Sequence, residues 1–311
     1  MSKSLRRIRK KIKNWIIFVI LKHGIIWVNK VDRKTGIKFL QNFACLGFYL
    51  ARSERHKTIK HLTMAYGSQK SSKEIYRMAR EVFLNLGRNM ADTLRLQQIN
   101  SENIDKYVKA EGLENLENAL RKGKGVIAIT GHIGNWELLG SYLAMKGFVT
   151  NVVGAPVYDP RLDDLVVKNR IQAGMKYISR EPVTSATKEV LRALRRNEVI
   201  GLLIDHDTNH VANVFIDFFG RKANTPVGPA VLAMKTGAAV VPTVIHSLED
   251  GTHLVQVEKE LVLNFSGDGD KDRIYNTQLC SDAIERFIRR YPTHWVWMHE
   301  RWKRQPKLQE K

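Results

Sequence analysis

From residue 124 onward, short apolar runs alternate with segments whose apolar residues recur at three- and four-residue steps. The predicted strands are residues 125–130, 149–154, 198–204, 238–245 and 253–263. The predicted helices are residues 136–146, 160–174, 185–196, 226–236 and 272–290. Because strands alternate with helices, we expect an α/β fold with a mixed, partly parallel central sheet flanked by helices.

The chain before this alternating part is mostly helical in pattern. Residues 72–86, for example, place apolar side chains on one helical face. We therefore divide the chain into an N-terminal helical region, residues 1–110, and an α/β core, residues 111–311. No repeat or low-complexity linker separates the two, so we expect the helices to pack on the same core.

The first 50 residues combine basic and apolar stretches. Seven Lys and Arg and no acid occupy residues 1–13, and apolar runs follow at 15–28 and 39–51. Lys22 and His23 interrupt the first run, whereas a spanning helix needs about 20 apolar residues. We expect a membrane-associating region that lies in the interface of an anionic membrane. Helices packed on the core, or a single-pass helix with its basic flank in the cytoplasm, are the alternatives.

Charge and cysteine content narrow the class of protein. Lys and Arg number 51 against 31 Asp and Glu, a net charge of +20, which attracts nucleic acid, anionic membranes, phosphorylated lipids or an acidic carrier protein. A hydrophobic content of 43% excludes a chain that is disordered by composition. Only Cys45 and Cys280 are present, which indicates apolar packing residues in a reducing compartment and no disulfide framework.

A histidine and an acid flank the turn between the first predicted strand and the first predicted helix of the core. His132 can act as a general base, and Glu137 can orient its imidazole and stabilise the imidazolium. Metal ligands on a helix lie four residues apart rather than five, so we expect neither a metal site nor a cofactor. A helix-capping histidine with a solvated glutamate is the alternative. For an oxyanion, we expect a backbone N–H near Gly134 as donor.

Further polar candidates follow at the same edge of the sheet. Asp205 and Asp207 come directly after the predicted strand 198–204, at the carboxyl edge that His132 shares. They favour a turn with site-shaping carboxylates over a metal site, with a plain Asx turn as the alternative. Arg170 can hold a phosphate or a carboxylate in a forked pair, unless it lies on a solvated helix face.

Two later segments combine aromatic residues with small or basic ones. Residues 214–233 place aromatic side chains before a turn rich in small residues, where an extended apolar ligand could run close to the backbone. Residues 295–304 interleave tryptophans with basic residues, which suits nucleic acid or a membrane-surface belt.

Several of these blocks together resemble the bacterial lipid A biosynthesis (lauroyl and myristoyl) acyltransferases, within the lysophospholipid acyltransferase superfamily. Residues 131–137 look like the His-x4-Glu block of that family. The later blocks follow in the expected order at Asp205-His206-Asp207, Phe218-Phe219-Gly220, Thr225–Ala230 and Met298–Lys303. Glycerophosphate acyltransferases of the superfamily carry Asp at the position of Glu137 and a Glu-Gly-Thr-Arg block, neither of which is present here.

The resemblance implies that the core transfers a fatty acyl chain from an acyl thioester on acyl carrier protein to a hydroxyl of a lipid A precursor or related phosphorylated glycolipid. His132 would be the general base and Glu137 its partner, with no covalent enzyme intermediate. The implied substrate-binding residues are Arg170, Asp205, Asp207 and Arg301.

The resemblance also implies partners and a location. The protein would work with anionic lipids at the cytoplasmic face of the inner membrane, without nucleic acid. Two other functions stay open. One is transfer from acyl-coenzyme A to another glycolipid or a lysophospholipid, and the other is a basic nucleic-acid-binding protein.

Overall fold

The computed structural model describes residues 3–157 and 159–306. The chain begins with four α-helices, which are α1 (Lys3–Lys30), α2 (Arg33–Leu50), α3 (Arg52–Tyr66) and α4 (Ser72–Leu94). Two 3-10 turns, η1 (Leu96–Gln98) and η2 (Ile104–Lys106), lead into the sheet. A capping box at Ser71 and Glu74 fixes the start of α4.

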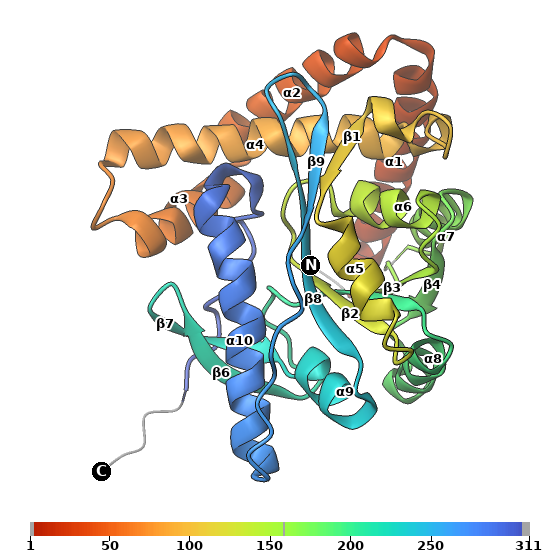
Figure 1. The fold of residues 1–311 in the computed structure, drawn as a ribbon. Helices are drawn as coiled ribbons and strands as arrows, with labels where there is room; N and C mark the ends of the chain where they lie inside the picture. The colour runs from red at the N-terminus through yellow and green to blue at the C-terminus, as the bar shows by residue number, and fades with distance from the viewer. Residues whose placement is uncertain (1–2, 158, 307–311) are drawn as a thin grey trace.

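The main sheet has the strand order β1-β9-β8-β2-β5-β3-β4 (Figure 1). Its strands are β1 (Val108–Glu111), β2 (Val126–Thr130), β3 (Thr150–Gly154), β4 (Lys176–Ser179), β5 (Val199–Leu203), β8 (Ala239–Ser247) and β9 (His253–Val257). From β8 to β4 all neighbours are parallel, whereas β9 runs antiparallel to β8 and parallel to β1. The predicted α/β fold with a mixed, partly parallel sheet is therefore confirmed.

Helices cover both faces of this sheet. The helices are α5 (Leu113–Leu120), α6 (Trp136–Met145), α7 (Pro160–Gln172), α8 (Val183–Arg195), α9 (Gly228–Thr236) and α10 (Gly269–Arg290). Val126 and Ala128 of β2 pack in one hydrophobic cluster with α5 and α6. Ile127 and Ile129 pack in the other, with α8, α9 and α10. Because both faces of β2 are buried, its sequence is apolar up to its last residue, Thr130.

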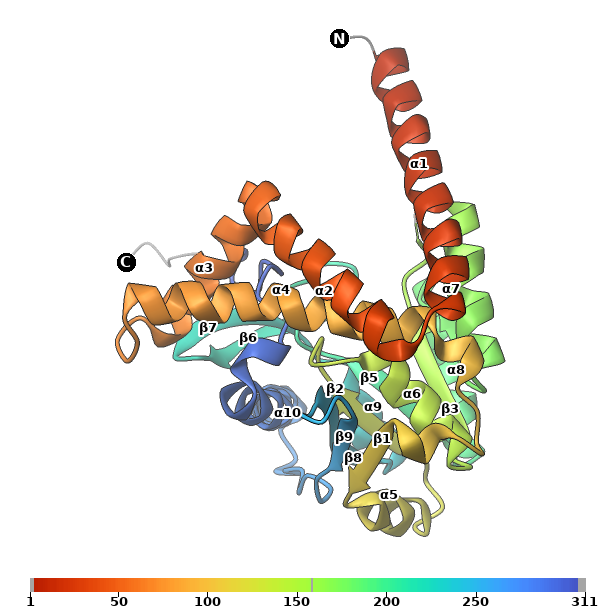
Figure 2. The same cartoon turned by 90° about the horizontal axis from the view of Figure 1, so that it is seen from above.

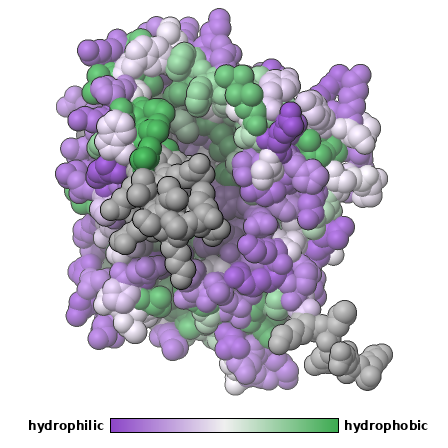
Figure 3. Space-filling view, turned by 180° about the vertical axis from the view of Figure 1, so that it is seen from behind, coloured by the Kyte–Doolittle hydropathy of each residue, from purple (hydrophilic) through white to green (hydrophobic). Residues whose placement is uncertain are grey.

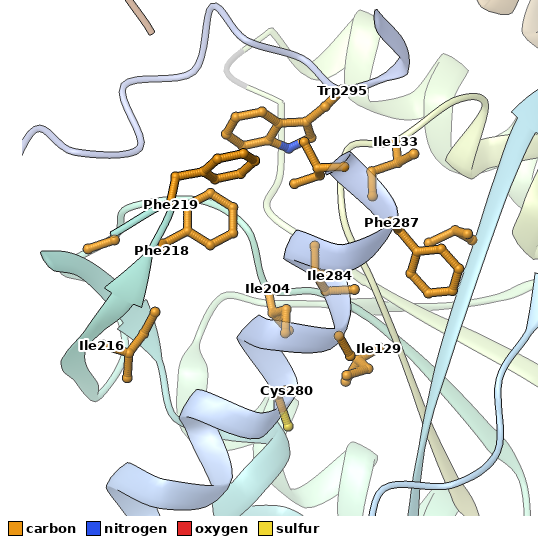
Figure 4. Close-up of a cluster of buried hydrophobic side chains, with 14 of the residues drawn as sticks. Ile129, Ile133, Ile204, Ile216, Phe218, Phe219, Cys280, Ile284, Phe287 and Trp295 are labelled. Carbon is orange, nitrogen blue, oxygen red and sulfur yellow. The ribbon is translucent and has the colours of Figure 1, made fainter. Parts of the chain in front are cut away.

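A two-stranded antiparallel hairpin, β6 (Asn213–Phe218) and β7 (Arg221–Pro226), packs beside α10. Figure 4 shows Phe218 and Phe219 of the hairpin region gathered with Trp295 at one end of α10, above Ile284. The Phe218 and Trp295 rings meet edge to face, with centroids 5.7 Å apart. This contact ties the hairpin to the segment that follows the 3-10 helix η3 (Pro292–His294).

The N-terminal helices share the core of the sheet, as expected. Leu62 of α3 and Ile75 of α4 belong to the same buried cluster as Ile127. Residue 110, where we divide the chain, lies inside β1, which pairs with β9. Helix α1 projects from the body, with α7 beside its C-terminal half (Figure 2), and Arg161 of α7 lies over the ring of Phe18 at 5.3 Å.

The predicted elements correspond to β2, β3, β5, β8, β9 and α6–α10, with ends that differ by a few residues. The predicted strand 253–263 is too long, because β9 ends at Val257. Four regions were missed: β1, α5, β4 and the β6–β7 hairpin. β4 has one buried residue, and β7 buries Asn224 and Thr225, so neither shows an apolar pattern.

Helices α1 and α2 expose large apolar side chains. They are Ile12, Trp15, Ile16, Ile20, Ile26 and Trp27 of α1, and Phe39, Phe43, Leu46, Tyr49 and Leu50 of α2. We call these residues the N-terminal apolar surface. Within residues 3–157 and 159–306, no helix has the length and apolar content needed to cross a membrane. The side chains of residues 1–11 and of Lys13, which include the predicted basic flank, lie outside those described.

Candidate active site

Two neighbouring parallel strands bring a histidine and an aspartate together. His132 lies two residues beyond β2, and Asp205 lies two residues beyond β5. The Nδ1 atom of His132 is 2.8 Å from Oδ1 of Asp205, and the backbone N–H of His132 donates to Oδ2 at 2.6 Å. Since a carboxylate only accepts, the proton of a neutral imidazole lies on Nδ1 and Nε2 keeps its lone pair. The shared carboxyl edge predicted for these residues is confirmed.

Asp205 is held by a third donor. The indole Nε1 of Trp295 donates to Oδ2 at 2.6 Å, and Asp205 is 3% exposed. Burial by itself raises the pKa of Asp205, but the charge and hydrogen bond of His132 and the bond from Trp295 outweigh it and hold that pKa below its usual value. In return, the same carboxylate overcomes the effect of burial on His132 and raises the imidazole pKa. The pair is therefore built to stabilise an imidazolium.

The turn that carries His132 is fixed by a glycine and by the segment after η3. Gly134 has φ +58°, and a Cβ there would lie 1.9 Å from the carbonyl oxygen of Ile245. Its N–H donates to the carbonyl of His294 at 2.9 Å. The N–H of Gly134 itself is thus already used, and the expectation of an oxyanion donor near this residue stays a prediction. The side chain of Asn135 then caps α6 at Leu138 N.

We had expected Glu137 to orient the imidazole of His132, but Glu137 forms no hydrogen bond with that ring. It lies in the first turn of α6 and accepts two hydrogen bonds from Arg170 of α7, Nε to Oε2 at 2.9 Å and Nη2 to Oε1 at 2.5 Å. The five-residue step spans the turn and the helix start, which aims Glu137 at α7 and leaves Nδ1 of His132 to Asp205. Its charge still contributes to the raised pKa of His132, after that of Asp205.

Arg170 forms the forked carboxylate pair that its sequence position allowed. Burial lowers its pKa, but Glu137 more than compensates and raises it. The guanidinium also lies 5.6 Å from the ring centroid of Tyr177. Arg170 lines the main cavity, and Glu137 holds it there.

Asp207 and Arg301 brace the wall of the site. Asp207 lines the cavity and accepts from Asn224 at 2.8 Å and from Arg304, whose backbone N lies at 2.8 Å. Arg301 is fully buried over the Phe218 ring and donates to the carbonyl of Asn224 and to Thr225 Oγ1, both at 2.5 Å. It is not among the cavity-lining residues, and burial lowers its pKa to about 10.

A cavity of about 1000 Å³ opens at His132. Its apolar wall comes from one face of α8, the start of α9 and the end of β5. These lining residues are Val183, Ala186 and Val190 of α8, Pro229, Val231 and Leu232 of α9, and Leu202, Leu203 and Ile204. Figure 3 shows apolar side chains gathered in the upper half of one face, beside a hollow bordered mostly by hydrophilic ones. The site thus joins a base to an apolar space.

Sequence reasoning missed three residues around His132. His299 is tilted over its ring with centroids 4.5 Å apart, and His206 lies edge-on at 6.0 Å. Burial, followed by the charge of His132, lowers the pKa of His299 to about 4, so this ring is neutral near pH 7. Both histidines and Trp295 belong to, or adjoin, the quoted blocks 205–207 and 298–303. Membership of those blocks was the signal that could have identified them.

The interleaved segment 295–304 serves neither of the roles we expected. Trp295, Trp297 and Trp302 are buried, so they cannot stack on nucleic-acid bases or sit in a membrane surface. Within the described residues, no group of three or more His, Cys, Asp or Glu side chains is arranged to hold a metal ion.

Comparisons with known proteins show which family the chain belongs to. Residues 3–304 match the family described as bacterial lipid A biosynthesis acyltransferase. The chain is 30% identical over 220 residues to the phosphatidylinositol mannoside acyltransferase of Mycobacterium tuberculosis, covering 70% of this chain and 67% of the relative. It is 23% identical over 239 residues to the lipid A biosynthesis lauroyltransferase of Escherichia coli, covering 76% and 75%. The palmitoleoyltransferase of lipid A biosynthesis in the same organism is 24% identical over 253 residues, covering 79% and 78%.

Proposed function

The chain belongs to the bacterial lipid A biosynthesis acyltransferase family and is an acyltransferase that acts on a lipid or glycolipid, and on that premise we propose its donor, acceptor and mechanism. The donor is a fatty acyl thioester on acyl carrier protein, and the acceptor is a hydroxyl of a lipid A precursor or related phosphorylated glycolipid. The observation that carries this proposal is the His132–Asp205 pair at the mouth of an apolar cavity.

The reaction follows from the two nitrogen atoms of His132. Nε2 takes the proton from the acceptor hydroxyl as its oxygen attacks the thioester carbonyl. The tetrahedral intermediate then expels the thiolate, which recovers that proton from the imidazolium. Asp205, bonded to Nδ1, stabilises the imidazolium between the two steps. A positioned base of this kind contributes about 10²- to 10⁴-fold.

The apolar wall accounts for the fatty chain. Val183, Ala186 and Val190 follow one another at helical spacing along α8, over roughly 10 Å from the carboxyl edge of the sheet. Within the described chain, no α8 residue after Val190 and no α9 residue after Leu232 lines the cavity. An acyl chain whose thioester lies at His132 would therefore extend between these helices and end near Val190 and Leu232.

Charge supports the two polar partners. A net charge of +20 attracts an acidic carrier protein and a phosphorylated acceptor from a distance. The relatives named above act on phosphatidylinositol mannoside or in lipid A biosynthesis. A phosphorylated glycolipid is an acceptor class that fits these names, and its phosphate would be attracted by the positive net charge of this chain.

The N-terminal apolar surface supports a position on the cytoplasmic face of the inner membrane. Trp15 is 55% exposed and Phe43 is 61% exposed, and such side chains are suited to the boundary between headgroups and acyl chains. The excess of Lys and Arg adds attraction to anionic lipids of the cytoplasmic leaflet. A protein bound in this way would meet its lipid acceptor at the membrane surface.

The direct test is transfer by the purified protein. The protein is incubated with acyl carrier protein thioesters of mixed chain length and a lipid A precursor, and products are identified by mass. We expect one ester-linked acyl chain to be added, and the His132→Ala variant to add none while keeping its melting temperature. Parallel reactions with acyl-coenzyme A and with a lysophospholipid test the alternative donor and acceptor. Full transfer by the His132→Ala variant would overturn the mechanism.

A further inference from the structure

Five Lys and Arg side chains line the cavity, and Arg180 differs from the other four. Each of the others contacts a carboxylate: Arg170 on Glu137, Arg273 on Asp270, Lys303 on Glu300 and Arg304 on Asp207. Within the described residues, Arg180 has no acidic partner within salt-bridge distance. Its Nε is buried and has no hydrogen-bond partner among those residues.

Arg180 is placed where the polar and apolar parts of the cavity meet. It follows β4 directly, and its backbone N–H donates to the carbonyl of Gly154 at the end of β3, at 2.8 Å. The apolar face of α8 begins three residues later at Val183. Burial and the charge of His132 lower the pKa of His206, and the charge of Arg180 adds to this effect. The guanidinium of Arg180 is therefore close enough to the histidines around the base to influence their charge.

A half-buried guanidinium that finds no acceptor in the described part of the protein has unsatisfied N–H donors there, which costs free energy unless a ligand supplies the oxygens. Phosphate offers several anionic oxygens in the geometry that the planar fork matches. We propose that Arg180 is a binding site for a phosphate group carried by a substrate of the transfer reaction. The proposal rests on the proposed function. Both substrates contain phosphate esters, namely the phosphopantetheine arm of the donor and the glycolipid phosphate of the acceptor.

Paired substrates identify which phosphate binds. Steady-state kinetics compare the parent with Arg180→Gln, using acyl-phosphopantetheine against acyl-pantetheine, and the phosphorylated glycolipid against its dephosphorylated form. We expect Arg180→Gln to raise the KM of one phosphate-bearing substrate by about 10- to 100-fold with little change in kcat. Removing that phosphate should cost the parent the same factor and cost the variant nothing more, because the two changes remove one interaction.

Two further variants control this experiment. Arg192→Gln removes the same charge from the exposed side of α8, where Arg192 pairs with Glu189, and should behave as the parent. Arg180→Lys keeps the charge without the fork and should recover part of the loss. The proposal is overturned if Arg180→Gln lowers kcat with both KM values unchanged. It is equally overturned if phosphate removal costs the variant as much as the parent.

A binding measurement separates this inference from the proposed function. If the parent transfers no acyl chain to any acceptor, the proposed function fails, and inorganic phosphate is then titrated and followed by ³¹P line broadening. Broadening by the parent and by Arg192→Gln, with its loss in Arg180→Gln of unchanged melting temperature, supports the site. Equal broadening by all three proteins overturns it.

Discussion

Nδ1 of His132 lies 2.8 Å from Oδ1 of Asp205, a residue 73 positions later in the chain. The acid that orients the base therefore comes from the turn after the neighbouring strand β5 and not from the His-x4-Glu block. Glu137 instead holds Arg170. This division assigns separate tasks to the two carboxylates, and the tasks can be separated by experiment.

Replacing Asp205 should weaken the base directly. Asp205→Asn removes the charge that raises the pKa of His132 and replaces an acceptor with a group that can also donate, so kcat/KM should fall by about 10³- to 10⁴-fold. Activity requires neutral His132, and in the parent the acidic limb of the pH–rate profile should lie above pH 6.5. In the variant this limb should move to lower pH. An unmoved limb would show that Asp205 does not set the pKa of the base.

Replacing Glu137 should act through Arg170. Glu137→Gln leaves a mostly buried guanidinium without its carboxylate, and we expect kcat/KM to fall by about 10- to 100-fold. The double variant Glu137→Gln with Arg170→Gln should lose less than the sum of the two single losses, because the residues form one pair. The acidic limb should shift much less than in Asp205→Asn. A shift as large as that variant's would instead assign Glu137 to the base.

The end of the apolar wall should select acyl chain length. Val190→Phe or Leu232→Phe fills the space where the cavity ends. The longest donor that the parent accepts should lose about 10-fold or more in kcat/KM, because overpacking costs free energy, while shorter donors should be unaffected. A series of thioesters differing by two carbons measures this, and Val183→Leu, nearer the cavity mouth, is the control. An unchanged profile would place the acyl chain elsewhere.

The N-terminal apolar surface should control membrane binding. Phe43→Asp puts a charge on this surface and should reduce binding to anionic vesicles by about 10- to 100-fold in a flotation assay. Val262→Asp makes the same change at a residue that is 89% exposed outside this surface, and it should bind as the parent does. Equal loss in both variants would mean that net charge, rather than this surface, governs binding.

The sequence predicted the sheet well wherever burial is two-sided. The first four residues of β2 are apolar because helices cover both of its faces, so its pattern is visible without any tertiary contact. The start of α6 was equally visible, since Asn135 caps it locally. β7 was missed because its buried residues Asn224 and Thr225 are polar. The Asn224 side chain donates to Asp207 and to the carbonyl of Thr208, and the Thr225 hydroxyl accepts from Arg301, far along the chain.

The location of the site could be predicted from the sequence, whereas the partner of the His132 imidazole could not. That His132 and Asp205 share one edge follows from their places after parallel strands, which local patterns reveal. Which carboxylate reaches Nδ1 depends on the direction of each side chain after its turn. These directions depend in turn on the hydrogen bond from Trp295 to Asp205 and on the backbone hydrogen bond between Gly134 and His294. These contacts join residues that are 90 or more positions apart, and no local pattern encodes them.

The backbone hydrogen bond between Gly134 and His294 also determines when the site can be completed during synthesis. When a ribosome has released the first 290 residues, His132, Asp205 and most of the apolar wall of the cavity have been synthesised. The carbonyl that anchors the turn and the indole that steadies the acid are still to come. Each new copy of the protein therefore stays without a finished site until residues 294 and 295 have been made.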